Sequence, residues 1–319
     1  MVKSDFNLGW IFYKEGHERD KKEVALPHDA MIYEQRSREA VTAGACGYFP
    51  GGKYVYEKSF EAPVEWEEGI YQQAQVYLNG QLTGTNIYGY SNFYVPLENG
   101  LVYGESNQLK VVADNSKCPN SRWYSGSGIY RKVNLYVGGE CYIHPEGVKI
   151  TTPEIDRIQI EADVTGGEQL RALIFDKGRK IAEGLAEIKE SLAKLSLDIQ
   201  KAKLWDAENP YLYEYQLELI NDGKVVDCVK GFLGIRTLSW DTKGFRVNGK
   251  EVLLRGACIH HDNGILGGCS FREAEERRIR ILKEAGFNAI RCSHNPASKD
   301  LLLACDKLGM SWTNLQISG

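Results

Sequence analysis

The stretch from Leu253 to Asp262 reads Leu-Leu-Arg-Gly-Ala-Cys-Ile-His-His-Asp, an apolar run that ends in titratable side chains. Residues Phe287 to Pro296 repeat this arrangement as Phe-Asn-Ala-Ile-Arg-Cys-Ser-His-Asn-Pro. Successive strands that end in His and Arg are typical of a (β/α)₈ barrel, whose active site lies at the carboxyl ends of its parallel strands. We therefore predict that residues 239–319 form the start of a TIM barrel.

Helix signals separate and follow these two predicted strands. Ser270 and Glu273 have the spacing of a capping box, and Gly286 marks the end of the first helix. Ser298 is positioned to cap a second helix, which Gly309 ends. The resulting strand–helix–strand–helix–strand order predicts parallel strands joined by right-handed crossovers.

Residues 1–138 have the pattern of an all-β domain. Side chains alternate along residues 53–60, and Asn79-Gly80 is a strong signal for a tight turn between strands 74–78 and 81–85. Many short strands separated by Gly, Pro and Asn favour a sandwich or jelly roll. We predict a jelly-roll domain here.

Residues 139–238 are also rich in strand patterns and contain about seven short strands, as in an immunoglobulin-like β-sandwich. Residues 157–164 alternate, and residues 213–220 lead into the turn Asn221-Asp222-Gly223. Residues 181–197 are rich in Ala, Leu, Glu and Lys, which also suits a helix; we predict two strands.

Composition limits the class of protein. The 319 residues carry a net charge of −4, so no basic excess is present to bind nucleic acid or an anionic membrane. No signal-peptide pattern and no transmembrane run is seen, and the eight cysteines are dispersed without a CxxC pair. We expect reduced thiols and a cytoplasmic location.

The candidate binding residues lie at the two strand ends. His260 and His261 are adjacent on a strand and therefore face opposite sides, and we expect His260 to point inward. Arg291 and His294 supply a rigid fork of donors and a neutral imidazole, which suit sugar hydroxyls; a buried structural arginine is an equally good reading of Arg291 alone. A metal site would need a third ligand that the sequence does not supply, so none is predicted.

Residues 122–131 read Arg-Trp-Tyr-Ser-Gly-Ser-Gly-Ile-Tyr-Arg and contain a G-x-G. This segment precedes a strand and not a helix, so it lacks the context of a dinucleotide-binding loop. We expect an aromatic, glycine-rich loop that packs against a neighbouring site.

Several motifs resemble glycoside hydrolase family 2, the group of β-galactosidases, β-glucuronidases and β-mannosidases. They span essentially residues 5–310 and are most similar to the β-galactosidase branch. The matching segments are 26–29 (Leu-Pro-His-Asp, with Ala30 where Trp is usual), 75–80, 122–131, 204–213, 231–236, 255–260 and 288–296.

The resemblance implies hydrolysis of terminal β-galactosides or related β-glycosides with retention of configuration, through two glutamates. It implies that Asn79, His260, Arg291 and His294 contact the sugar. It places both glutamates on the fourth and seventh barrel strands, so we expect them beyond the end of this chain and expect the chain alone to be inactive. It implies no organic cofactor and leaves open a cation in the full-length enzyme.

Two segments depart from the family pattern. Residues 64–71 run directly from Trp66 to Gly69 where similar proteins have a further strand, which suggests the loss of one jelly-roll strand. Residues 310–315 replace an apolar strand that usually ends in an acidic pair. We expect a truncated gene or altered reading frame, and self-association through the incomplete barrel. A non-catalytic carbohydrate-binding remnant or a complementing fragment is the alternative function.

Overall fold

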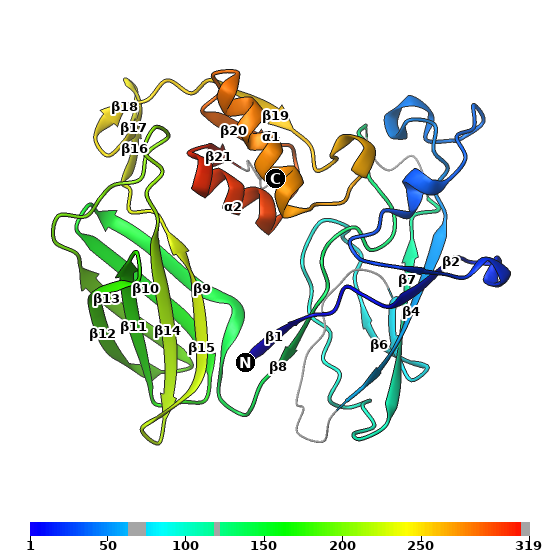
Figure 1. Ribbon diagram of the computed structural model, residues 1–319, viewed down its shortest axis with the longest axis horizontal. Helices are drawn as coiled ribbons and strands as arrows, with labels where there is room; N and C mark the ends of the chain where they lie inside the picture. Colours follow the sequence, from blue (N-terminus) through cyan, green and yellow to red (C-terminus); the bar gives the residue numbers. More distant parts are fainter. Residues whose placement is uncertain (63–74, 118–121, 314–319) are drawn as a thin grey trace.

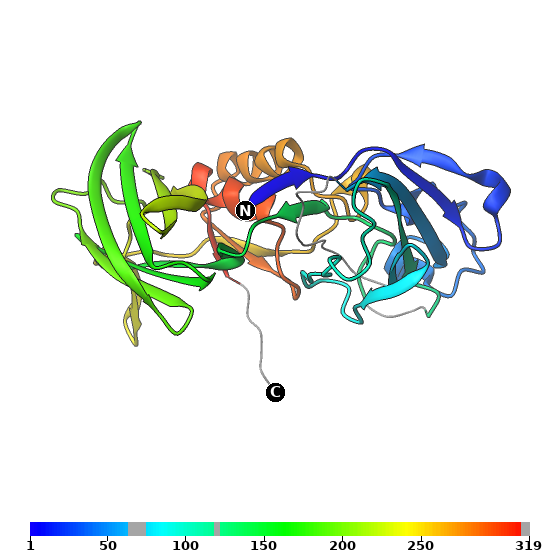
Figure 2. The ribbon, with the colours of Figure 1, turned by 90° about the horizontal axis from the view of Figure 1, so that it is seen from below.

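The computed structural model describes residues 1–62, 75–117 and 122–313, and three units follow one another along the chain (Figure 1). The fold is mainly β, with two sandwich-like units flanking a small strand-and-helix unit near the carboxyl terminus. Figure 2 shows the two β units at opposite ends of the molecule with the helices between them. The predicted multidomain, mainly β architecture is confirmed. The strand loss suggested for residues 64–71 lies outside the described residues.

The amino-terminal unit consists of antiparallel strands around an aromatic core. A six-stranded sheet has the order β3-β2-β4-β7-β5-β6, and β1 pairs with β8. Its core contains Trp10, Tyr54 and Tyr56, all fully buried. The elements are β1 (Val2–Asp5), β2 (Trp10–Lys14), η1 (Glu18–Asp20), β3 (Lys22–Val24), η2 (Ala30–Tyr33), η3 (Ala43–Cys46), β4 (Lys53–Glu61), β5 (Gln75–Leu78), β6 (Gln81–Thr85), β7 (Ser106–Asp114) and β8 (Asn134–Val137). The hairpin predicted at Asn79-Gly80 joins β5 to β6 and is confirmed.

The second unit is a seven-stranded antiparallel sandwich. The strands follow the order β15-β14-β11-β12-β13-β10-β9, and β12 passes from one sheet to the other. They are β9 (Tyr142–Glu154), β10 (Arg157–Thr165), β11 (Gln169–Asp176), β12 (Arg179–Lys189), β13 (Leu192–Asp198), β14 (Tyr213–Asn221) and β15 (Lys224–Leu233). The inward residues of both sheets share one apolar core. Residues 181–197 form two strands, as predicted.

The third unit begins with the small antiparallel sheet of β16 (Leu238–Asp241), β17 (Gly244–Val247) and β18 (Lys250–Glu251). It continues with β19 (Gly256–Ile259), η4 (Gly264–Leu266), α1 (Arg272–Glu284), β20 (Ala289–Cys292), α2 (Lys299–Leu308) and β21 (Ser311–Thr313). The strands β19, β20 and β21 are parallel, which confirms the predicted order of strands and helices. Apolar residues of β20, α1 and α2 form its core.

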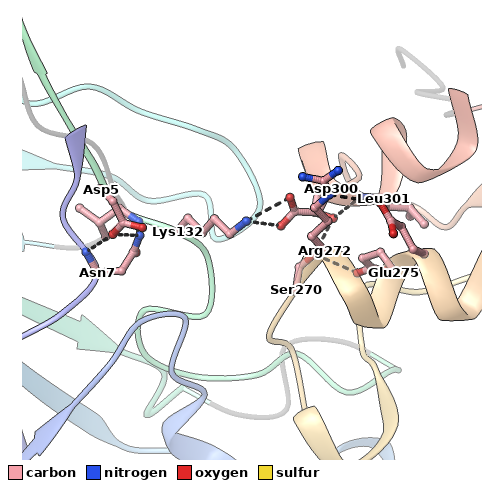
Figure 3. Close-up of polar contacts among 11 residues, drawn as sticks. Asp5, Asn7, Lys132, Ser270, Arg272, Glu275, Asp300 and Leu301 are labelled. Atoms are coloured by element: carbon pink, nitrogen blue, oxygen red, sulfur yellow. Dashed lines mark hydrogen bonds and ion pairs between the residues drawn. The ribbon is translucent and has the colours of Figure 1, made fainter. Parts of the chain in front are cut away.

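The two helix starts differ from each other. The amide of Leu301 donates to the Ser298 hydroxyl at 3.1 Å, so Ser298 caps α2 as predicted. The capping box at Ser270 is wrong, because α1 begins at Arg272 and its N-cap, Phe271, offers no side-chain bond. The Ser270 hydroxyl is buried and bonds the Glu275 carboxylate at 2.9 Å instead, a contact visible in Figure 3. The side-chain contacts of Ser270 replace the N-cap hydrogen bond that the sequence predicted.

Among the residues that the structure describes, no helix combines the length and apolar character needed to cross a bilayer.

Candidate functional site

Parallel pairing brings the ends of β19 and β20 together. Ile259 is in register with Cys292, so the segments that begin at His260 and Ser293 leave the sheet at the same edge. Cys292 is buried against the helices, whereas Arg291 lies on the opposite face of the sheet, beside Cys258 at 3.7 Å. The sheet therefore presents Arg291 on the face that a closed barrel would turn toward its axis.

An aromatic side chain from the amino-terminal unit covers the histidines. The Trp123 ring stacks on His260, with 5.2 Å between centroids and 19° between planes, and meets His294 edge-on at 5.6 Å. The two histidine rings lie 6.2 Å apart. The glycine-rich loop thus packs against the ends of β19 and β20; that these ends form a binding site stays a prediction. Trp123, His260 and His294 form one cluster, which we call the aromatic wall.

His261 faces away from the aromatic wall. A ring nitrogen, Nε2, lies 3.0 Å from the Ser125 carbonyl, and the ring packs against Tyr90 and Tyr130 at 5.0 and 5.8 Å. Burial lowers the pKa of His261 to about 4, so the ring is neutral at pH 7 and Nε2 donates to the carbonyl. The two adjacent histidines thus have different partners, although both lie just after β19 and not on the strand as the sequence predicted.

Two further tyrosines extend the cluster, and sequence reasoning did not single them out. The Tyr88 hydroxyl donates to Asn295 Oδ1 at 3.2 Å, and Trp123 Nε1 donates to the Tyr90 hydroxyl at 3.3 Å. The only sequence signal was the density of aromatic residues around Gly89. These tyrosines and Trp123 line a cavity of about 580 Å³ on the amino-terminal unit.

A buried carboxylate ties the glycine-rich loop to the barrel segment. Asp29 is 1% exposed, and its Oδ1 accepts from the amides of Met31 and Ser127, each at 3.0 Å. Its Oδ2 accepts from the Tyr124 hydroxyl and from the Gly268 amide, each at 2.7 Å. These four hydrogen bonds offset the free-energy cost of burying the charged carboxylate. Asp29 therefore holds the loop that carries Trp123 against the strand ends.

Buried polar atoms near the aromatic wall lack hydrogen-bond partners within the described part of the chain. They include His260 Nδ1, Arg291 Nε and Asn295 Nδ2. An unsatisfied buried donor or acceptor costs about 1–3 kcal/mol, so such a group usually has a water or ligand partner. All three atoms belong to residues at or just after the ends of β19 and β20. In residues 1–62, 75–117 and 122–313, no group of three or more His, Cys, Asp or Glu is arranged to hold a metal ion.

Asn79 is not brought into this cluster. Its amide nitrogen donates to the Gly100 carbonyl at 2.9 Å and to Asn107 Oδ1 at 2.8 Å, and its oxygen accepts from the Gln108 amide at 2.8 Å. These bonds fix the turn between β5 and β6. A sugar contact by Asn79 stays a prediction, whereas His260, His294 and Arg291 lie at one edge of one sheet.

Comparisons with known proteins identify the family of this chain. Residues 146–236 match the model of glycosyl hydrolases family 2, and residues 240–313 match the model of the TIM barrel domain of the same family. A beta-galactosidase from Bacteroides ovatus, BoGH2A, is 36% identical over 96% of this chain, and a putative beta-glucuronidase from Formosa agariphila is 30% identical over 97%. This chain spans 40% of the first protein and 32% of the second.

Solved structures agree with the sequence matches. A glycosyl hydrolase family 2 member from Bacteroides cellulosilyticus superimposes with a TM-score of 0.89 at 31% identity, over 98% of this chain and 45% of that one. A beta-glycosidase from Bacteroides vulgatus gives a TM-score of 0.89 at 27% identity, over 98% of this chain and 44% of that one. The order of three units described above is thus shared along almost the whole chain.

Proposed function

Because the chain belongs to glycoside hydrolase family 2, we propose that the whole protein hydrolyses terminal β-galactosides or related β-glycosides with retention of configuration. The residues of this chain contribute the part of the site that holds the sugar. The single observation that carries the proposal is the stack of Trp123 on His260 at the carboxyl ends of parallel strands.

The aromatic wall suits a pyranose ring. An aromatic face packs against the C–H groups of a sugar, while imidazole and guanidinium donors bond its hydroxyls. In this proposal His260 and Arg291, whose nitrogens Nδ1 and Nε have no partner within the described residues, and the exposed ring of His294 supply these polar groups. The guanidinium of Arg291 can bond either a sugar hydroxyl or a carboxylate.

The names of the relatives support the reaction class and leave the sugar undecided. They include beta-galactosidases and beta-glucuronidases. Both names refer to a β-linked terminal sugar; galactose and glucuronic acid differ in the configuration of the 4-hydroxyl and in C6, which is a hydroxymethyl group in the first and a carboxylate in the second. We propose the galactoside because the relative with 36% identity is named a beta-galactosidase.

Hydrolysis of 4-nitrophenyl β-D-galactoside and β-D-glucuronide by the whole protein tests the proposal. We expect turnover of the galactoside, and we expect Trp123→Ala to raise KM about tenfold or more through lost stacking. Trp240→Ala is the matched control, because Trp240 on β16 is 78% exposed. Binding of galactosides without any turnover would instead favour the carbohydrate-binding alternative.

A further inference from the structure

A second cavity adjoins the first and lies where the amino-terminal unit meets α2. Its volume is about 350 Å³. Strands β1 and β8 and the loop around Tyr90 form one side, and residues 296–300 at the start of α2 form the other. We call it the junction cleft. It shares Tyr90 and Tyr130 with the strand-end region but contains none of the three members of the aromatic wall.

The junction cleft is positively charged on a chain that is negative as a whole. Lys3, Arg131, Lys132 and Lys299 line it, against the two carboxylates Glu146 and Asp300. Lys132 pairs with Asp300 across the junction at 2.8 Å, as Figure 3 shows, and Lys299 pairs with Glu146. Each of the two carboxylates is therefore already paired with a lysine. The chain as a whole carries a net charge of −4.

Two cations in the cleft have no carboxylate partner within the described part of the chain. Arg131 donates to the Gly268 carbonyl at 2.6 Å and lies 4.9 Å from the centre of the Tyr130 ring. Lys3 Nζ lies 5.8 Å from the centre of the Tyr136 ring. Burial and then the charge of Lys299 lower the pKa of Lys3; Glu146 raises it, Lys132 lowers it and Asp300 raises it by smaller amounts, so that the pKa is lowered on balance. An anion entering the cleft would relieve this repulsion.

Tyrosine rings supply the apolar surface of the same cleft. Tyr90, Tyr94, Tyr130 and Tyr136 line it, and the Tyr94 and Tyr136 rings lie 6.1 Å apart at 58°. Side-chain amides of Asn92 and Asn134 add groups that both donate and accept. Aromatic faces, amides and excess lysines in one cavity match a ligand that has a hydroxylated ring and a negative charge.

We propose that the junction cleft binds an acidic sugar unit of a glycan, with its carboxylate or sulfate near Lys3 and its ring against the tyrosines. This site is separate from the catalytic sugar site proposed above. It would hold a charged part of a longer substrate while the strand ends hold the terminal sugar.

Calorimetric titration of this chain at low salt tests the proposal with four probes: methyl β-D-glucuronide, glucose 6-sulfate, methyl β-D-glucoside and inorganic sulfate. We expect one or both acidic sugars to bind more tightly than the neutral glucoside and than sulfate alone. Lys3→Gln should weaken that binding about tenfold, since it removes one charge-assisted hydrogen bond. Lys224→Gln, on an exposed strand of the second unit, is the matched control and should change nothing.

His260→Ala separates this site from the aromatic wall, because it should leave the Lys3-dependent binding intact. Equal binding of acidic and neutral sugars would overturn the proposal, as would equal affinity in the Lys3→Gln variant. Sulfate alone binding as tightly as the acidic sugars would show a plain anion site and would also overturn it.

Discussion

The Asp29 carboxylate accepts a hydrogen bond from the Gly268 amide at 2.7 Å, although 239 positions separate the two residues. This bond joins the amino-terminal unit to the loop that leads into α1. The same carboxylate holds Ser127 and Tyr124 of the loop that carries Trp123. The position of the aromatic wall therefore depends on a residue that lies outside it.

Replacing Asp29 by Asn should destabilise this junction. The amide keeps only one oxygen, and its NH2 group faces either the Gly268 amide or the amides of Met31 and Ser127, so at least one buried backbone N–H loses its acceptor. We expect a loss of about 2–3 kcal/mol in the free energy of unfolding, measured by urea denaturation. Asp156→Asn, in an exposed turn, is the control and should change stability by less than about 0.5 kcal/mol. An unchanged Asp29→Asn variant would contradict the bridging role.

Two glycines next to the bond between Asp29 and Gly268 allow a comparison of two alanine variants. Gly264 and Gly267 both have positive φ, +55° and +60°, but a Cβ at Gly264 meets nothing within 4 Å. A Cβ at Gly267 would lie 2.2 Å from Asp29 Oδ2. We expect Gly264→Ala to cost about 1 kcal/mol through backbone strain and Gly267→Ala to cost at least 2 kcal/mol more. Equal unfolding midpoints for the two variants would show that Asp29 is not tightly enclosed.

Stability should fall as the pH is lowered below neutrality. Burial lowers the pKa of His28 and of His261 to about 4, against about 6.5 in an unfolded chain. Between these values the unfolded state binds protons that the folded state does not, so folding is favoured above pH 6.5 and this advantage is lost toward pH 4. Each histidine should contribute a loss of about 2 kcal/mol between pH 7 and pH 5.

Variants of single histidines check this assignment. His28→Gln should flatten the pH dependence of the free energy of unfolding by about 2 kcal/mol over that interval. His17→Gln is the control, because the His17 side chain is 60% exposed. If both variants kept the slope of the unmodified chain, His28 would not be a buried neutral group.

Exposed apolar residues beside the parallel sheet should make this chain self-associate. Leu253 and Leu254 are 76% and 49% exposed, and Trp312 on β21 is 41% exposed. Burying such side chains against a second copy is favourable by about 25 cal/mol for each Å² of apolar surface. We expect light scattering to detect dimers or larger species that diminish in the Leu253→Ser, Leu254→Ser double variant. A monomer at every concentration would contradict this expectation.

The sequence predicted the parallel strands and both sandwiches because their signals are local. Ser298, Gly286 and Gly309 mark helix ends through bonds and dihedral angles within a few residues, and the structure has α1 and α2 end at these glycines. Ser270 failed as a cap because its hydroxyl bonds Glu275 and Ser298, a choice made by packing.

The site was predictable only in part, because some of its contacts are local in the sequence and others are not. His260, Arg291 and His294 follow from the strand pattern, and the loop around Trp123 follows from its aromatic and glycine content. The role of Asp29 and the contact of Tyr88 with Asn295 join residues far apart in the chain, so neither periodicity nor spacing could show them.

The most direct test of the sugar-binding role is a saturation-transfer NMR measurement of methyl β-D-galactoside with this chain and its Trp123→Ala and Trp240→Ala variants. We predict transfer to the sugar protons from the unmodified chain and from Trp240→Ala, and its loss in Trp123→Ala. Equal transfer in all three proteins, or none in any, would contradict the assignment of the aromatic wall as the sugar site.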